Sequence, residues 1–274
     1  MIKFKTEKLS NRITRIFGFT SELMYLVEGD ERAALLDTGS GIGSLKSCVN
    51  ELTSKPVIVL ITHGHVDHAM GAAEFDEVYM NHADDCLYLE HGDMQFRKTG
   101  LNMIPTEAGI TETDLIPTAP VESFHDFRGG DVFDLGGVSI EVFDCAGHTK
   151  GSVVFFIREE RSILLGDACN YFTFMFDRYA TTITEYKANL EFLLKALKNK
   201  EIDIVYLSHG DGNGHKELIE DIITVCQDIQ NGNTDDIPFS FQGVDALIAK
   251  ATIPDDIKRV DGGKGNIVYN KSRI

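Results

Sequence analysis

The sequence lacks any pair of cysteines spaced as Cys-x-x-Cys. Its five cysteines are odd in number and widely scattered, so neither a disulfide framework nor a cysteine-rich zinc knuckle is indicated. We expect most of them to pack as small apolar side chains in a reducing compartment.

Long apolar runs are also missing. The longest, residues 57–61 and 153–157, are far too short to cross a bilayer, which needs about 20 apolar residues. The opening stretch MIKFKTEKLS carries charges where a signal peptide needs an apolar segment. We therefore expect a cytoplasmic protein without a membrane partner.

Basic residues are scarce relative to acidic ones. The chain has 26 Lys and Arg against 43 Asp and Glu, a formal net charge of −17. Such a surface repels phosphate backbones, so we expect a small-molecule substrate and no nucleic acid, with a homodimer left open. The length of 274 residues and the 43% hydrophobic content fit a globular protein with a substantial core.

Hydrophobic periodicity places strands and helices along the chain. Strands are predicted at 12–17, 23–28, 33–36, 57–61, 131–135, 138–144, 152–157, 162–165, 204–207 and 266–269, and helices at 45–52, 184–197, 217–229 and 244–249. We interpret residues 1–274 as one domain of two similar halves. Helices and loops at about 81–125 would form a rim or cap, and a C-terminal extension would start at about 232.

Ligand-type side chains are concentrated directly after the apolar segment VIVLI. His63, His65, Asp67 and His68 stand within six positions there. Loops that leave buried strands are where α/β proteins gather catalytic groups. Zinc and its neighbours bind imidazole nitrogen and carboxylate oxygen, and a tight turn can direct one pair of these residues to each of two nearby metals. A solvent-exposed loop is the ordinary alternative for a single histidine, but a weak one for this cluster.

Three further candidates follow the same rule, an apolar strand and then a glycine beside a ligand-type residue. They are His148 in Gly147-His148-Thr149, Asp167 in Gly166-Asp167-Ala168, and His209 in Ser208-His209-Gly210. Each is weak alone, and together they indicate a metal site.

The order of these motifs, HGHVDH, GHTKGS, GDA and LSHG, resembles that of the metallo-β-lactamase-fold hydrolase superfamily. LLDTG at 35–39 resembles its first motif, and the likeness extends from about residue 13 to about 210. The resemblance implies an α/β fold, a four-layer αββα sandwich with metals at one edge between two sheets.

Carried over by motif, the resemblance assigns the first metal to His63, His65 and His148, the second to Asp67, His68 and His209, and a bridging role to Asp167. It implies two divalent ions, zinc ahead of iron or manganese, and a metal-held hydroxide as nucleophile. Asp67 would orient that hydroxide or take its proton. Asp37 either orients a ligand by hydrogen bonding or is a strand-end turn carboxylate.

Departures from the family pattern narrow the chemistry. Asp167 stands where true β-lactamases usually have cysteine, which argues against a β-lactamase. Ala146 and Lys150 replace prolines that are frequent in the third motif, so that loop would be looser. Cys169 is expected to be a packing residue. The compact size resembles the glyoxalase II-like and lactonase-like branches.

Residues that face the substrate are harder to identify. Tyr171 could position substrate, by likeness to lactonases at a different offset, or could be an aromatic at the pocket rim. Phe172, Phe174, Met175 and Phe176 could form an apolar wall for a substrate or could be core. The remaining histidines are expected to be structural, namely His82, His91, His125 and His215.

These features predict hydrolysis of a small ester-like bond in a thioester, lactone or phosphodiester. A mono-iron sulfur dioxygenase on the same fold is the alternative. Metal binding without catalysis is a third class, and the ligand set fits an open, water-bearing site better than a closed structural one.

Overall fold

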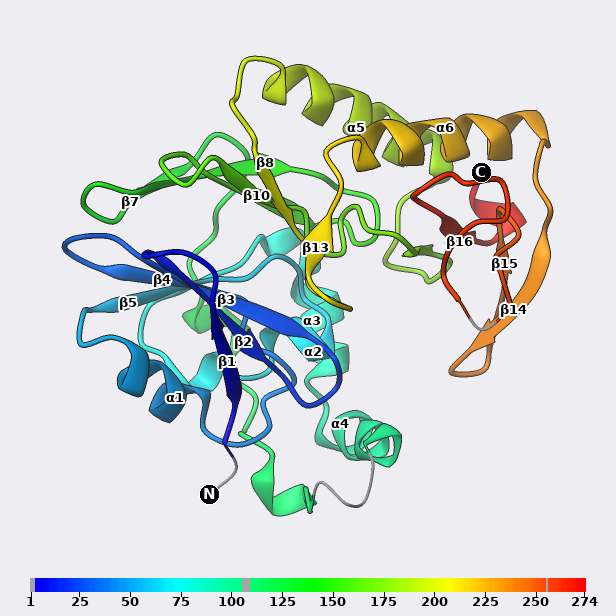
Figure 1. Cartoon of the computed structure of the whole chain (residues 1–274). Helices are drawn as coiled ribbons and strands as arrows, with labels where there is room; N and C mark the ends of the chain where they lie inside the picture. Colours follow the sequence, from blue (N-terminus) through cyan, green and yellow to red (C-terminus); the bar gives the residue numbers. More distant parts are fainter. Residues whose placement is uncertain (1–2, 105–108, 255) are drawn as a thin grey trace.

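A computed structural model describes residues 3–104, 109–254 and 256–274. Two six-stranded sheets pack face to face, and helices cover the outer face of each (Figure 1). This is the predicted four-layer αββα arrangement. A smaller four-stranded sheet, formed largely by the C-terminal residues, lies at one end of the molecule (Figure 1).

The first sheet has the strand order β1-β2-β3-β4-β5-β6. Its strands are β1 (Lys5–Lys8), β2 (Ile13–Phe17), β3 (Leu23–Glu28), β4 (Ala33–Leu36), β5 (Val57–Leu60) and β6 (Val78–Tyr79). β1 to β4 pair antiparallel, whereas β4, β5 and β6 run parallel. The apolar segment that precedes the histidine-rich run is therefore an interior strand of this sheet, as its composition predicts.

The second sheet has the order β13-β12-β10-β9-β8-β7. Its strands are β7 (Val132–Asp134), β8 (Ser139–Asp144), β9 (Val153–Ile157), β10 (Ser162–Leu164), β12 (Ile204–Tyr206) and β13 (Asn213–Gly214). β10 and β12 are parallel, so both end at the same edge.

The third sheet has the order β11-β16-β15-β14. Its strands are β11 (Thr173–Met175), β14 (Ile237–Phe241), β15 (Val244–Ile248) and β16 (Ile267–Tyr269). The helix predicted at 244–249 is wrong, because this segment is β15, antiparallel to β14. Gln242 and Gly243 both have positive φ, 49° and 81°, which is the backbone of a two-residue hairpin turn and directs the chain back along β14.

Helices cover the two large sheets. They are α1 (Leu45–Leu52), α2 (Val66–Ala69), α3 (Asp85–His91), α4 (Met94–Gly100), α5 (Ile183–Leu197) and α6 (Leu218–Asn231). α5 begins with a capping box in which Thr182 and Glu185 bond each other's backbone N–H groups. None of the described helices is long and apolar enough to span a membrane.

Short 3-10 helices lie mainly in the predicted rim. They are η1 (Ala72–Glu74), η2 (His82–Asp84), η3 (Leu101–Met103), η5 (Glu112–Asp114), η6 (Val121–Ser123) and η7 (Lys271–Arg273). With α3 and α4 they agree with the helices and loops expected at 81–125. Residues 105–108 of that segment lie outside the described residues.

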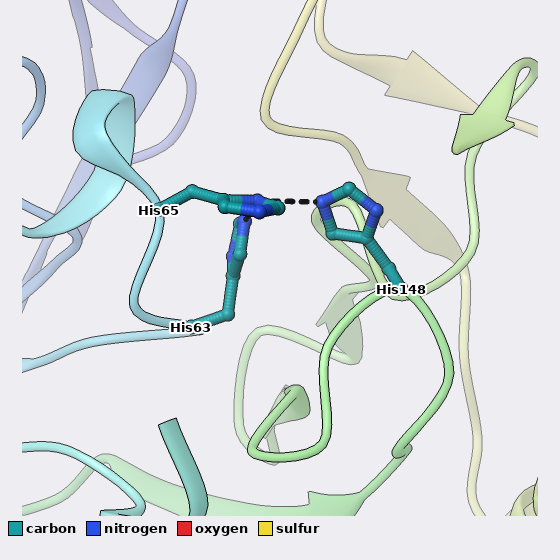
Figure 2. Close-up of side chains that lie close together, drawn as sticks. All are labelled: His63, His65 and His148. Atoms are coloured by element: carbon teal, nitrogen blue, oxygen red, sulfur yellow. Dashed lines mark hydrogen bonds between the residues drawn. The ribbon is translucent and has the colours of Figure 1, made fainter. Parts of the chain in front are cut away.

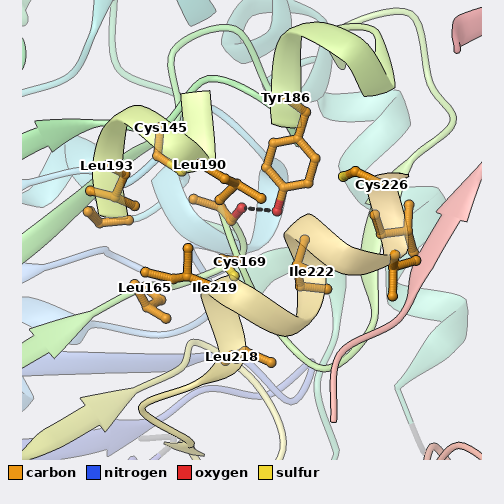
Figure 3. Close-up of a cluster of buried hydrophobic side chains, with 14 of the residues drawn as sticks. Cys145, Leu165, Cys169, Tyr186, Leu190, Leu193, Leu218, Ile219, Ile222 and Cys226 are labelled. Carbon is orange, nitrogen blue, oxygen red and sulfur yellow. Dashed lines mark hydrogen bonds between the residues drawn. The ribbon is translucent and has the colours of Figure 1, made fainter. Parts of the chain in front are cut away.

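Three apolar clusters hold the layers together. One fills the space between the two large sheets, and a second lies between the first sheet and α1, α2 and α3. The third joins the second sheet to α5 and α6 (Figure 3). Cys145, Cys169 and Cys226 are buried in this third cluster, which confirms the packing role expected of Cys169.

Candidate metal centre

The seven predicted ligands come from loops that follow β5, β8, β10 and β12. β8, β10 and β12 run in the same direction, because β9 is antiparallel to both β8 and β10 and β10 is parallel to β12. Their carboxyl ends therefore share one edge of the second sheet, where the residues that follow β5 meet them. The ligand atoms of the seven residues form three overlapping sets, each within 4.8 Å. We call His63, His65 and His148 the first group and Asp67, His68 and His209 the second group. The third set, His63, His68 and Asp167, links the two groups. Residues far apart in the sequence thus gather as the motifs predict.

The first group consists of three imidazoles that point toward one another (Figure 2). The Nδ1 of His65 lies 2.9 Å from the Nε2 of His63 and 2.9 Å from the Nε2 of His148. The Nδ1 of His148 donates to the carbonyl oxygen of Phe174 at 2.7 Å. Thr62 donates its hydroxyl to Asp37, so its oxygen accepts from the Nδ1 of His63 at 3.0 Å. These two hydrogen bonds occupy the Nδ1 atoms of His148 and His63, so the Nε2 lone pair of each ring points toward the other histidines of the group.

The second group combines carboxylates with imidazoles. The Nε2 of His209 lies 3.1 Å from the Oδ2 of Asp167 and 3.4 Å from the Oδ2 of Asp67. The same oxygen of Asp167 lies 3.5 Å from the Nε2 of His68 and 3.9 Å from the Nε2 of His148. Asp167 therefore stands between the two groups, where a bridging ligand is expected.

Protonation differs between the two groups. Burial and the neighbouring histidines hold the pKa of His63 well below its usual value, so its ring is neutral at neutral pH. Burial alone would lower the pKa of His209, but the Asp167 carboxylate outweighs it and raises the pKa to about 9. Burial opposes ionisation of Asp167, yet His209 and His68 hold the pKa of its carboxyl well below the usual range.

The arrangement fits divalent cations. The Nε2 of His68 is buried and has no hydrogen-bond partner among the residues that the structure describes, which is costly for a polar atom. In the first group, inward-facing lone pairs repel one another unless a cation or proton stands between them. Imidazole nitrogens with carboxylate oxygens beside them are the donor set that zinc, iron and manganese accept.

Asp37 orients one of these ligands. It is buried, and its Oδ2 accepts from the Nδ1 of His68 at 2.8 Å. Its Oδ1 accepts from the backbone N–H of Thr62 at 2.7 Å. Of the two interpretations left open by the sequence, the structure favours the orienting carboxylate.

Tyr186 of α5 fixes two ligand loops. Its hydroxyl donates to the carbonyl oxygen of Ala168, next to Asp167, at 2.6 Å. A Cβ at Gly147 would lie 2.1 Å from its ring, so the glycine before His148 lets helix and loop approach. Figure 3 shows Tyr186 within the third cluster, so the apolar packing around its ring also supports these two loops.

Asp84 was missed by sequence reasoning. This buried carboxylate accepts from the N–H of Gly64 at 2.9 Å, from the hydroxyl of Thr149 at 2.6 Å and from the N–H of Gly151 at 2.7 Å. It thereby joins the loop that carries His63 and His65 to the loop that carries His148. Its position shortly after β6 is the only sequence signal that could have indicated it.

Two more residues around His65 were not predicted. The Oδ2 of Asp177 lies 3.6 Å from the Nε2 of His65. The ring of His91 stacks on that of His65 with centroids 5.0 Å apart, and its Nδ1 accepts from the N–H of Val66 at 3.2 Å. His91 thus packs against the centre, although its sequence context lacks the strand and glycine of the other candidates.

Other predicted residues lie apart from the centre. Tyr171 packs against the third cluster and His215, with ring centroids 6.0 Å apart, and no hydrogen bond or ion pair joins it to the seven residues in the described chain. Met175 is fully buried and is core rather than part of an apolar wall. The Nδ1 of His82 lies 2.8 Å from the Oδ1 of Asp85, and the ring of His125 packs against that of Tyr79 at a tilt of 34°.

Comparisons with known proteins agree with this geometry. Residues 17–209 match the family model described as the metallo-beta-lactamase superfamily. The acyl-coenzyme A thioesterase MBLAC2 of Homo sapiens is 23% identical over 210 residues, which cover 71% of this chain and 75% of that protein. The hydroxyacylglutathione hydrolase GloC of Haemophilus influenzae (strain ATCC 51907 / DSM 11121 / KW20 / Rd) is 24% identical over 160 residues, covering 57% and 69%.

A solved metallo-beta-lactamase from Pontibacter korlensis superposes with a TM-score of 0.57 at 17% identity, covering 82% of this chain and 99% of that one. At this identity the likeness shows the fold alone. The family model spans more than half of the 274 residues and includes every predicted ligand. The chain belongs to the metallo-beta-lactamase superfamily.

Proposed function

We propose that this protein is a metal-dependent hydrolase that acts on a small thioester. The observation that carries the proposal is that seven ligand-type side chains converge in two adjacent groups. The set His63, His68 and Asp167 links these groups, and Asp167 also lies 3.9 Å from the Nε2 of His148. The side chains of Asp67 and His209 are 28% and 32% exposed, so the second group faces solvent and a substrate can reach it. An open position of this kind distinguishes catalytic from structural metal sites.

The two groups would hold two divalent metal ions, zinc ahead of iron or manganese. His63, His65 and His148 would hold one ion, Asp67, His68 and His209 the other, and Asp167 would contact both. Such ions supply Lewis acidity toward the scissile carbonyl and lower the pKa of water to about 7.

The side chains of the protein then have distinct tasks. Asp37 and the Phe174 carbonyl orient His68 and His148 through their Nδ1 atoms. The partly exposed Asp67 is the carboxylate placed to orient the attacking water and to accept its proton. Burial of His63 and His68 keeps bulk water away from the rear of the centre.

The thioester is favoured over the lactone and the phosphodiester by the named relatives. One is called an acyl-coenzyme A thioesterase and the other a hydroxyacylglutathione hydrolase. Acyl-coenzyme A and acylglutathione are both thioesters. The acidic composition, with a net charge of −17, also disfavours a polyanionic phosphodiester such as a nucleic acid.

A hydrolysis panel tests the proposal. Protein reconstituted with zinc, manganese or iron is assayed on thioesters, lactones and phosphodiesters, with the Asp67→Ala variant as the matched control. We expect thioester cleavage that a chelator abolishes and that falls at least about 100-fold in Asp67→Ala, in line with general-base contributions. Lactone or phosphodiester turnover without thioester turnover would contradict the substrate class. Oxygen consumption with a persulfide, in place of hydrolysis, would overturn the reaction type.

A further inference from the structure

Five phenylalanine rings gather on the third sheet, close to the metal centre. We call this group the aromatic platform: Phe172, Phe174, Phe176, Phe239 and Phe241. The ring of Phe174 is central, with centroid distances of 5.2 Å to Phe176, 5.7 Å to Phe239 and 5.5 Å to Phe241. These contacts join β11 at one edge of the sheet to β14 at the other.

Strand alternation explains why the rings share a face. In β11, Thr173 and Met175 are fully buried on the opposite side, so Phe172, Phe174 and Phe176 point the other way. Phe239 and Phe241 are likewise two residues apart on β14. The two central strands contribute Ala246 and Val268 to the same cluster, and the rings from both edges pack against these smaller side chains.

Phe176 is buried at 9% exposure, but the rest of the described chain leaves the other four rings partly uncovered. Phe241 is 38% exposed, and Ile237 and Val244 of the same hairpin are each 40% exposed. Phe172, Phe174 and Phe239 are only partly buried. Contiguous exposed apolar surface of this kind is uncommon unless it binds something.

The backbone of the strand that carries part of the platform is hydrogen-bonded to the metal centre. The carbonyl oxygen of Phe174 accepts the Nδ1–H of His148 at 2.7 Å. Phe176 precedes Asp177, whose Oδ2 lies 3.6 Å from the Nε2 of His65. Two of the three histidines of the first group therefore touch the segment that carries the platform, so a molecule whose reactive carbonyl is at the centre has this apolar surface beside it.

We propose that the aromatic platform binds the apolar acyl chain of the thioester and so selects substrates with long aliphatic or aromatic acyl groups. This inference rests on the proposed function. All five side chains are uncharged, which fits a hydrocarbon and offers nothing to an anionic nucleotide or peptide carboxylate. Phe172, Phe174 and Phe176 lie within the family match, which ends at residue 209, whereas Phe239 and Phe241 lie beyond it, so the C-terminal extension of this chain completes the platform.

If the platform binds the acyl chain, kcat/KM should rise with the length of that chain. A fully buried methylene contributes about 0.8 kcal/mol, about a fourfold change in affinity. A surface that covers the chain from one side should give about half of that free energy, a rise in kcat/KM of about twofold per methylene.

The first experiment measures kcat/KM for straight-chain acyl thioesters from two to twelve carbons. Phe241→Ser is compared with Phe192→Ser, a control on α5 whose ring is 69% exposed. We expect the twelve-to-two-carbon ratio to fall at least about tenfold in Phe241→Ser, and to keep its value in Phe192→Ser. Thioester hydrolysis with no dependence on chain length overturns the platform alone. Absence of thioester hydrolysis overturns the proposed function.

A binding experiment gives a readout independent of turnover and of the stability of Phe241→Ser. The chain has no tryptophan, so Phe241→Trp introduces a single indole, and Phe192→Trp is its matched control. The probe is the non-hydrolysable decyl thioether of coenzyme A, with free coenzyme A for comparison. We expect the emission of the indole in Phe241→Trp to show a saturable blue shift with the thioether only, and the control to show no shift. An equal response to both probes, no response, or a shift that follows protein concentration without a probe overturns the proposal.

Discussion

The two groups of ligands at the metal centre are built in different ways. The loops of the three-histidine group are held through their backbone, by the buried Asp84 that bonds Gly64 on one loop and Gly151 on the other. In the second group Asp37 accepts from His68, and the Ser21 carbonyl oxygen accepts from the Nδ1 of His209 at 3.2 Å. His63 and His148 have ring hydrogen bonds of the same kind, so the additional backbone bonds to Asp84 are what set the first group apart. The side chain of His148 is 7% exposed, whereas that of His209 is 32% exposed.

This difference suggests that the first group holds its metal rigidly and that the second group is the one that substrate and water reach. A group fixed by backbone hydrogen bonds inside the protein keeps its geometry whether or not substrate is present. A group fixed by individual side chains at the solvent edge leaves room for substrate and water. We infer that the three-histidine group retains its metal more tightly and that the second group is the one at which metal exchange begins.

The largest expected effect comes from His63, because it belongs to two of the three ligand sets. His63→Ala should lose the first metal, weaken binding of the second because its ring also lies beside His68 and Asp167, and lower activity by at least about 1,000-fold, since metal ions contribute several kcal/mol. His209→Ala, which touches only the second group, should retain one metal per chain. Elemental mass spectrometry of the two purified variants measures the number of metal ions that each chain retains. Equal metal content in the two variants would contradict the comparison.

Asp84 should matter next, through stability. Asp84→Ala leaves the buried N–H groups of Gly64 and Gly151 without an acceptor and removes one of the two hydroxyl partners of Thr149, at a cost of about 1–3 kcal/mol for each unsatisfied donor. We expect the free energy of unfolding to fall by about 3 kcal/mol or more in chemical denaturation. Thr149→Val removes one of these donors and should cost about 1 kcal/mol. A loss of under 1 kcal/mol in Asp84→Ala would show that the backbone does not depend on this residue.

Asp37 should act mainly on the second group. Asp37→Asn replaces the acceptor of the His68 Nδ1–H and should weaken binding of the second metal by about 10- to 100-fold. The first metal should be affected less, because Asp37 reaches His63 only through the hydroxyl of Thr62. Competition with a fluorescent chelator gives both affinities. An equal loss at both positions would remove the distinction between the groups.

The smallest effect is expected at Tyr171, which makes no hydrogen bond or ion pair with either group in the described structure and packs against His215. Tyr171→Phe should change kcat/KM by less than about threefold, within the range of one exposed hydrogen bond. Steady-state kinetics on the thioester panel measures this. A loss of about 100-fold would restore the substrate-positioning role that the sequence indicated.

Much of the centre could be predicted because its ligands are local signals. Each of His148, Asp167 and His209 follows an apolar strand beside a glycine, and parallel strands bring such ends together. Asp84 and Asp177 carry no such signal, since their partners lie far away in the sequence. Their roles arise from tertiary packing and appear only in the structure.

The third sheet is a second feature that the sequence could not predict in full. The hydrophobic residues of Val244–Ile248 fit a short helix as well as a strand, and the prediction chose the helix. The positive φ of Gln242, a residue that does not favour it, sets the hairpin turn. The aromatic platform depends on that hairpin, so the sequence could indicate the rings at 172–176 and not their partners at 239 and 241.

The most direct test of the two-metal centre is a crystal structure of the zinc-reconstituted protein with anomalous difference maps at the zinc edge. We expect two peaks, one contacting the Nε2 of His63, the Nδ1 of His65 and the Nε2 of His148, the other contacting Asp67, His68 and His209, with Asp167 beside both. Ions bound elsewhere, or no ion at this edge of the sandwich, would contradict the account.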